Sequence, residues 1–341
     1  MIVLCITKTY GGIVGFSNSK NTIKNCKNIG KIEAKNVFFI GGLVGRCGED
    51  TTIEECANDG TIEGKGYIGG IAGFVTSLTS ISECYNNSLI SGNNTIGGIV
   101  GYAQKSNTIN ECNNNGKVKG EGYIGGIAGY LNQSCTISKC KNSTLIEGKD
   151  YVGGIAGYSY VASSIIECHN SGSVNGKGGT DGVGGIAGHA ASVVKQCSNT
   201  GNVTGIGNKG IGGIVGRCVS KQGQDISLCY NSGVIKGEID VGGISGVFGS
   251  SNANPEPKEY NCYNKGKIIN TTDQSLAGGI AGKMSKGGKI TNCYYLENIG
   301  VTQGLGAAVN EEELTAQNKE AKSTDVDLKS FEDFLEWIAQ Q

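Results

Sequence analysis

Short apolar clusters alternate with polar segments rich in Asn, Gly and Ser along almost the whole chain. Between positions 67 and 95, for example, the clusters YIGGIAGF, ISECYN and SLIS follow one another, each bounded by Gly, Asn or Ser. Short runs rich in Ile and Val between turn residues predict strands separated by turns. Three strands of about five residues and turns of about four residues fill one such unit.

The unit recurs at a nearly fixed period. A Gly-Gly-apolar-x-Gly phrase occurs ten times, most often 28 residues apart, and its Gly-Gly pairs begin at Gly11, Gly41, Gly69, Gly97, Gly125, Gly153, Gly184, Gly212, Gly242 and Gly278. A fixed period indicates stacked repeats, and glycines in mid-unit disfavour the helix that a leucine-rich repeat needs. The sequence therefore predicts an all-β fold, a parallel β-solenoid (β-helix) of about ten coils with three short strands each.

The residues on either side of the Gly-Gly pair are both apolar. Ile or Leu follows the pair in all ten copies, and Ile or Val precedes it in eight. Strict strand alternation would send these two side chains to opposite faces. We therefore expect a bend at Gly-Gly, where the absence of Cβ atoms permits it, so that both side chains enter the core.

A second set of columns surrounds a repeated cysteine. Ten cysteines share one position: Cys26, Cys56, Cys84, Cys112, Cys140, Cys168, Cys197, Cys229, Cys262 and Cys293. Stacked at the interstrand spacing of about 4.8 Å, their Cβ vectors are parallel, a geometry that does not favour disulfides. We predict a ladder of reduced, buried thiols. Three positions earlier, Ile or Val recurs until Glu259 interrupts the column.

Two residues after the cysteine, asparagine recurs in nine copies. The column comprises Asn28, Asn58, Asn86, Asn114, Asn142, Asn170, Asn199, Asn231 and Asn264. Asparagine suits turns, and identical amides stacked in register can hydrogen-bond from coil to coil. We predict an asparagine ladder at this corner.

The repeat pattern ends near Leu296, and the remaining sequence predicts helices. Asn310 precedes three glutamates, and Ser330 begins a Ser-x-x-Asp capping box. We therefore divide the chain into a solenoid at 1–300 and a small helical C-terminal cap at 301–341. Leu328, Phe331, Leu335 and Ile338 share one helical face, which we expect to cover the open end of the stack.

Charge and composition exclude two classes of partner. The 29 basic and 30 acidic residues nearly balance, without the basic patch of a nucleic-acid-binding protein. No apolar run reaches the roughly 18 residues that cross a membrane. The first eight residues lack the features of a signal peptide, and the first repeat follows them directly, so we expect the chain to be part of a longer protein.

Groups able to carry chemistry are sparse. His-Glu-x-x-His is absent, the only histidines are His169 and His189, and the carboxylates are scattered over turns. We therefore expect no catalytic residues, no metal site and no cofactor. The candidate binding surface is the column after the third glycine: Phe16, Arg46, Phe74, Tyr102, Tyr130, Tyr158, His189 and Arg217. The periodicity leaves open whether this column faces outward or into the core.

The phrase at Gly42-Leu43-Val44-Gly45 resembles the GLUG motif, a repeat of bacterial surface proteins that include adhesins and the non-catalytic regions of IgA-specific metallopeptidases. The resemblance implies a non-catalytic module, secreted or at the cell surface, for adhesion or structural display. Host or neighbouring-cell proteins or glycans would be its partners. Two alternatives remain: an accessory region of a metallopeptidase whose catalytic domain lies outside this chain, and a β-helical carbohydrate-active enzyme.

Overall fold

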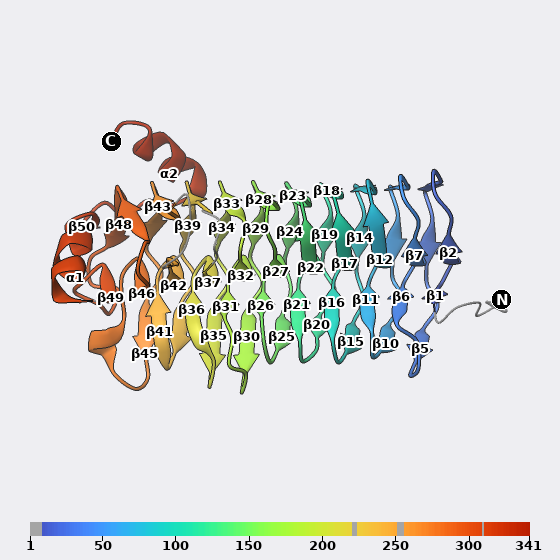
Figure 1. The fold of residues 1–341 in the computed structure, drawn as a ribbon, viewed down its shortest axis with the longest axis horizontal. Coiled ribbons are helices and arrows are strands. Elements are labelled where there is room, and N and C mark those ends of the chain that lie inside the picture. Colours follow the sequence, from blue (N-terminus) through green and yellow to red (C-terminus); the bar gives the residue numbers. More distant parts are fainter. Residues whose placement is uncertain (1–8, 220–223, 251–255, 309) are drawn as a thin grey trace.

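The computed structural model describes residues 9–219, 224–250, 256–308 and 310–341. They form an elongated parallel β-solenoid whose coils stack along one axis (Figure 1). The predicted fold class is confirmed. The first eight residues, including Cys5, lie outside the described part of the chain.

One coil contains five strand segments, because two of the three predicted clusters are each divided. The first cluster breaks at Gly69-Gly70, and the second breaks at Glu83, whose φ is 51°. A positive φ turns the backbone sharply before Cys84. The strands of this coil are β11 (Tyr67–Gly69), β12 (Ala72–Ser77), β13 (Ser80–Ser82), β14 (Tyr85–Asn86) and β15 (Ile90–Gly92).

Equivalent strands of successive coils pair in parallel and form five sheets of nine, eleven, ten, eleven and nine strands. We name them sheets A to E in the order in which one coil visits them. Their first and last strands are β1 (Thr9–Gly11) and β41 (Ile239–Gly242) in A, β2 (Val14–Ser17) and β49 (Leu305–Ala307) in B, β3 (Thr22–Lys24) and β47 (Lys289–Thr291) in C, β4 (Lys27–Asn28) and β50 (Ala321–Thr324) in D, and β5 (Ile32–Ala34) and β45 (Ile268–Asn270) in E.

The Gly-Gly pair makes the predicted bend between sheets A and B. A Cβ atom on Gly69 would lie 2.0 Å from the carbonyl oxygen of Ala72, and one on Gly70 would lie 2.1 Å from that of Gly98. Neither position admits a side chain. Ile68 and Ile71, on either side, are fully buried, so both flanking residues enter the core as expected.

The asparagine ladder is continuous. Each Nδ2 from Asn28 to Asn231 donates to the Oδ1 of the next asparagine over 2.7–2.8 Å. In seven of these eight asparagines the same Nδ2 also donates to the backbone carbonyl two residues ahead, as Asn86 does to Ser88. Because these amides are buried, this pairing removes the cost of leaving polar groups without partners.

The cysteine column lies in the core. All thirteen cysteines of the described residues are free, and all except Cys26 are buried. Each thiol points along the stack, as Cys84 does toward the carbonyl oxygens of Ser82 and Ile53. The predicted burial is confirmed for nine of the ten members of the column, and Cys26, in the first coil, is the exception.

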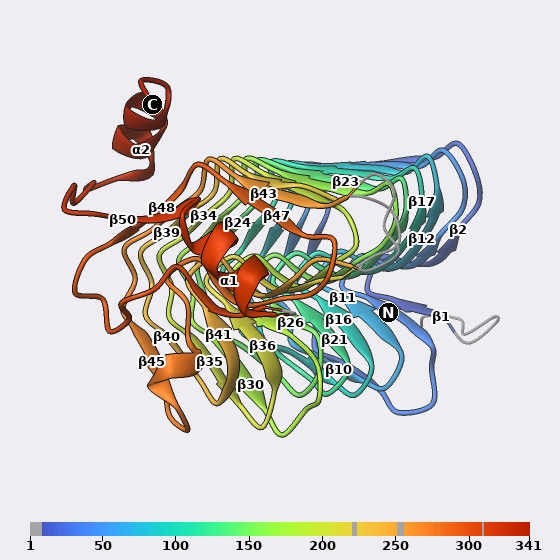
Figure 2. The ribbon, with the colours of Figure 1, turned by 60° about the vertical axis from the view of Figure 1, so that its left-hand side comes forward.

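The chain beyond position 300 contributes to the stack as well as to the helices. Strands β49 and β50 extend sheets B and D. Helix α1 (Glu311–Asn318), capped by Asn310, lies at the C-terminal end beside β47, β49 and β50 (Figure 2).

The position of helix α2 (Phe331–Ile338) differs from the expectation that its apolar face covers the open end of the stack. Its capping box at Ser330 is present, but its apolar face does not cover the end of the stack. Instead it packs on the flank of sheet D, where Phe334 meets Tyr230 and Tyr263 (Figure 1). The tyrosines supply the apolar surface that this amphipathic helix needs.

Candidate functional site: an aromatic strip on sheets A and B

The eight predicted site residues occupy one register of sheet B. Each pairs with the next along the series Phe16, Arg46, Phe74, Tyr102, Tyr130, Tyr158, His189 and Arg217. The sheet therefore brings together residues that are up to 201 positions apart in the sequence (217 − 16). Whether they bind anything remains a prediction.

The column faces outward. On β12 the side chain that follows, Val75, is fully buried, whereas Phe74 is half-buried. The other seven members are also half-buried, except for Phe16, which is 46% exposed. Because neighbouring side chains on a strand point to opposite faces, the rings lie opposite the buried Val75 column, on the outer surface.

The aromatic rings stack along the solenoid axis. Ring centroids are 5.2 Å apart for Phe74 and Tyr102, 5.0 Å for Tyr102 and Tyr130, and 5.0 Å for Tyr130 and Tyr158, with interplanar angles of 3–7°. His189 continues the stack at 4.6 Å from Tyr158. The ring faces are therefore covered by neighbouring coils, and ring edges and phenol hydroxyls remain toward solvent.

Sheet A supplies a second aromatic column that the sequence analysis missed. Its members are Phe39, Tyr67 and Tyr123 on sheet A and Tyr151, which directly precedes the sheet A strand β26 (Val152–Gly153); each stands two residues before its Gly-Gly pair. Tyr67 lies 5.1 Å from Tyr102, and Tyr123 meets Tyr130 edge-on at 5.2 Å. The two columns together form one surface, which we call the aromatic strip. The signal was present in the sequence, but Thr95 interrupts it and it ends before Gly182.

Arg46 joins the two columns near the N-terminal end. Its guanidinium carbon lies 5.6 Å from the ring centroids of Phe16 and Phe74 and 5.7 Å from that of Phe39. Cation–π contact with three rings stabilises the charge in this position. Arginine thus replaces an aromatic residue without breaking the stack.

At the other end, Arg217 occupies space that the sheet A column leaves empty. Cβ atoms on Gly182 and Gly210 would lie 3.0 Å and 2.7 Å from Cγ of Arg217. Burial, with a further contribution from Arg217, lowers the pKa of His189 to about 4. This imidazole is therefore neutral at physiological pH and behaves as a ring of the stack.

Burial among the other rings raises the phenol pKa of Tyr102 and Tyr130, and that of Tyr158 to about 12. The phenols remain protonated at physiological pH and can each donate a hydrogen bond. The strip offers a partner neutral hydroxyls between aromatic edges, with a cation at Arg46 and another at Arg217.

The described residues contain no group of three or more His, Cys, Asp or Glu side chains arranged to hold a metal ion. Within the same ranges, no helix has the length and apolar character needed to cross a membrane.

No protein-family model matches this chain, and no curated protein matches it. One solved structure is similar: a protein of Bacteroides ovatus that carries the provisional name of an immunoglobulin A1 protease. The two chains are 20% identical with a TM-score of 0.33, over 83% of this chain and 80% of that chain. Nothing about function follows from a similarity this low.

Proposed function

We propose that this chain is a non-catalytic repeat module of the GLUG-motif type, displayed outside the cell, which uses the aromatic strip to contact a partner. The observation that carries the proposal is the strip itself. The sheet B column stacks rings over five successive coils, from Phe74 to His189, and the sheet A column adds an aromatic residue beside it in three of these coils. The repeated Gly-Gly-Ile/Leu-Val/Ala-Gly phrase supports the assignment to this repeat type.

The geometry of the stack favours a protein partner for the strip. A sugar ring that packs on an aromatic side chain needs an open ring face, and the faces of Tyr102 and Tyr130 are covered by stacking. Ring edges and tyrosine hydroxyls, in contrast, are common in protein interfaces. Because rings recur in successive coils from Phe74 to His189, weak contacts can add up along this part of the rod.

Binding of the fluorescently labelled chain to epithelial cells tests the proposal. We expect saturable binding that is lost after trypsin treatment of the cells and retained after enzymatic deglycosylation. The proposed adhesive role would be contradicted if the labelled chain bound neither epithelial cells nor bacterial cells. A reading frame that continues into a metallopeptidase domain would instead support the accessory-region alternative.

A further inference from the structure

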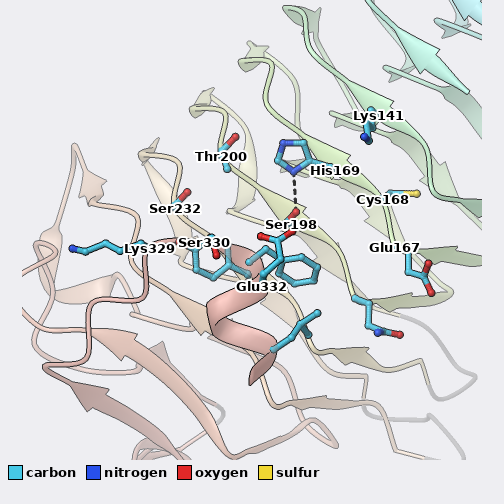
Figure 3. A pocket seen from close by; sticks show the side chains of 14 residues that line it. Lys141, Glu167, Cys168, His169, Ser198, Thr200, Ser232, Lys329, Ser330 and Glu332 are labelled. Carbon is cyan, nitrogen blue, oxygen red and sulfur yellow. Dashed lines mark hydrogen bonds between the residues drawn. The ribbon is translucent and has the colours of Figure 1, made fainter. Parts of the chain in front are cut away.

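A cleft of about 660 Å³ lies between helix α2 and the flank of sheet D (Figure 3). None of the aromatic-strip residues lines it. Its volume falls in the range of small-molecule sites, about 300–1,000 Å³. The polar side is formed by Lys141, His169, Ser198 and Ser232, which come from four successive coils. The helix contributes Phe331 and Glu332.

The polar side is built from two columns beside the asparagine ladder. His169 and Ser198 precede their ladder asparagines, and Thr200 and Ser232 follow theirs. Nδ1 of His169 and Oγ of Ser198 form a hydrogen bond of 2.8 Å, which fixes the imidazole (Figure 3). Because the ladder asparagines are fully buried and hydrogen-bonded, these side chains stand on a rigid support.

The charges that line the cleft balance. Two lysines, Lys141 and Lys329, and two glutamates, Glu167 and Glu332, line it. Lys329 also pairs with Asp327, which lies outside the lining. Burial, followed by the charge of Lys141, lowers the pKa of His169, so that its imidazole is neutral near pH 7. Among the described residues, neither Lys141 nor Glu332 forms an ion pair or a side-chain hydrogen bond, so both remain available to a ligand. A lining without net charge does not favour an anion or a cation.

The helix side of the cleft is apolar. Phe331 and Leu335 line it, and Tyr230 lies below them, with its ring centroid 6.3 Å from that of Phe331. Hydroxyl, amide and charged groups therefore face an aromatic and aliphatic wall across the same space. Small-molecule sites commonly combine an apolar wall with a few convergent polar groups in this way.

We propose that this cleft binds a short neutral oligosaccharide of about two or three sugar units. The sugar hydroxyls would pair with Lys141, His169, Ser232 and Glu332, and the C–H face of a sugar would pack on Phe331. The site is separate from the aromatic strip, so its occupation does not depend on the function proposed for the strip.

Saturation-transfer NMR with cellobiose, maltotriose, lactose and N,N′-diacetylchitobiose tests the proposal, followed by titration of any sugar that binds. We expect at least one of the four to bind with a Kd of about 1 mM or below, the range in which weak recognition is measurable. Ser232→Leu, which fills the cleft, should weaken this binding by about tenfold or more. Ser143→Leu is the matched control, because Ser143 also follows a ladder asparagine but lies outside the cleft.

A second variant on the other side of the cleft guards against misfolding of the first. Glu332→Ala changes an exposed residue of α2 and should also weaken binding, while the circular-dichroism melting curve stays that of the unchanged protein. Failure of all four sugars to bind would overturn the proposal. It would also be overturned if binding survived both cleft variants, or if 3′-sialyllactose, which is anionic, bound more tightly than lactose.

Discussion

Asn86 donates a hydrogen bond from Nδ2 to Oδ1 of Asn114, 2.8 Å away, and Asn114 does the same to Asn142. Each amide therefore depends on the next, and the ladder links coils that are otherwise joined by short strands. Asn86 and Asn114 are fully buried, so removing one ladder amide leaves polar atoms of its neighbours without partners in the interior.

Asn114→Ala should lower the free energy of unfolding by about 2–3 kcal/mol, because Nδ2 of Asn86 loses its acceptor. Asn115→Ala is the matched control. It removes a neighbouring exposed amide, which donates to Asn87 over 3.0 Å, and should change stability by less than about 0.5 kcal/mol. Urea denaturation measures both. Equal effects of the two substitutions would show that the ladder does not stabilise the stack.

Gly70→Ala should prevent normal folding or lower the free energy of unfolding by more than about 4 kcal/mol, because the new Cβ would meet the backbone oxygen of Gly98 at 2.1 Å. Gly30→Ala should be nearly neutral, since its closest neighbour would be Oδ1 of Asn28 at 3.6 Å. Soluble expression and thermal melting distinguish the two variants. A Gly70→Ala protein that melts like the unchanged chain would contradict the bend described here.

Glu259 should make stability depend on pH. It replaces Ile in the core column between Ile226 and Ile290, is fully buried, and accepts a hydrogen bond of 2.7 Å from Ser245. Burial raises its pKa to about 8, so the folded state keeps a proton that the unfolded state has released above about 4.5. The contribution of this proton to the free energy of unfolding is therefore complete below pH 4.5, and it is lost progressively as the pH rises to about 8.

Urea denaturation at several pH values checks this dependence. The free energy of unfolding should fall by up to about 1.4 kcal/mol per pH unit within the window. Glu259→Gln should flatten the slope, and the exposed control Glu121→Gln should leave it unchanged. A slope unaffected by Glu259→Gln would place the titrating group elsewhere.

Thiol labelling tests the cysteine ladder. With the folded protein, we expect rapid labelling of few groups, Cys26 first, because it is the only described cysteine that is not buried. In denaturant, all 14 thiols of the chain should react. Ready labelling of ten or more thiols in the folded state would refute the burial of the column.

The sequence predicted the features that repeat and missed those that occur once or break off. The bend at Gly69-Gly70 and the asparagine ladder follow from columns that nearly every coil keeps. The second aromatic column was missed because Thr95 interrupts it and it ends before Gly182. The position of α2 was missed because an amphipathic pattern shows that a helix has an apolar face but not which surface receives it. The sequence signal for the surface that receives α2 was Tyr230 and Tyr263, two large side chains that lie outside the solenoid core.

The most direct test of the proposed contact surface is cell binding by a strip variant. Tyr102→Ser, Tyr130→Ser and Tyr158→Ser are combined in one protein, and Tyr85→Ser serves as the control, since Tyr85 is 40% exposed and lies on sheet D. Circular dichroism establishes that both variants are folded before binding of the labelled chains to epithelial cells is measured. We predict that the triple variant loses binding by about tenfold or more, while Tyr85→Ser binds like the unchanged protein. Binding by a folded triple variant at the level of the unchanged protein would contradict the role assigned to the aromatic strip.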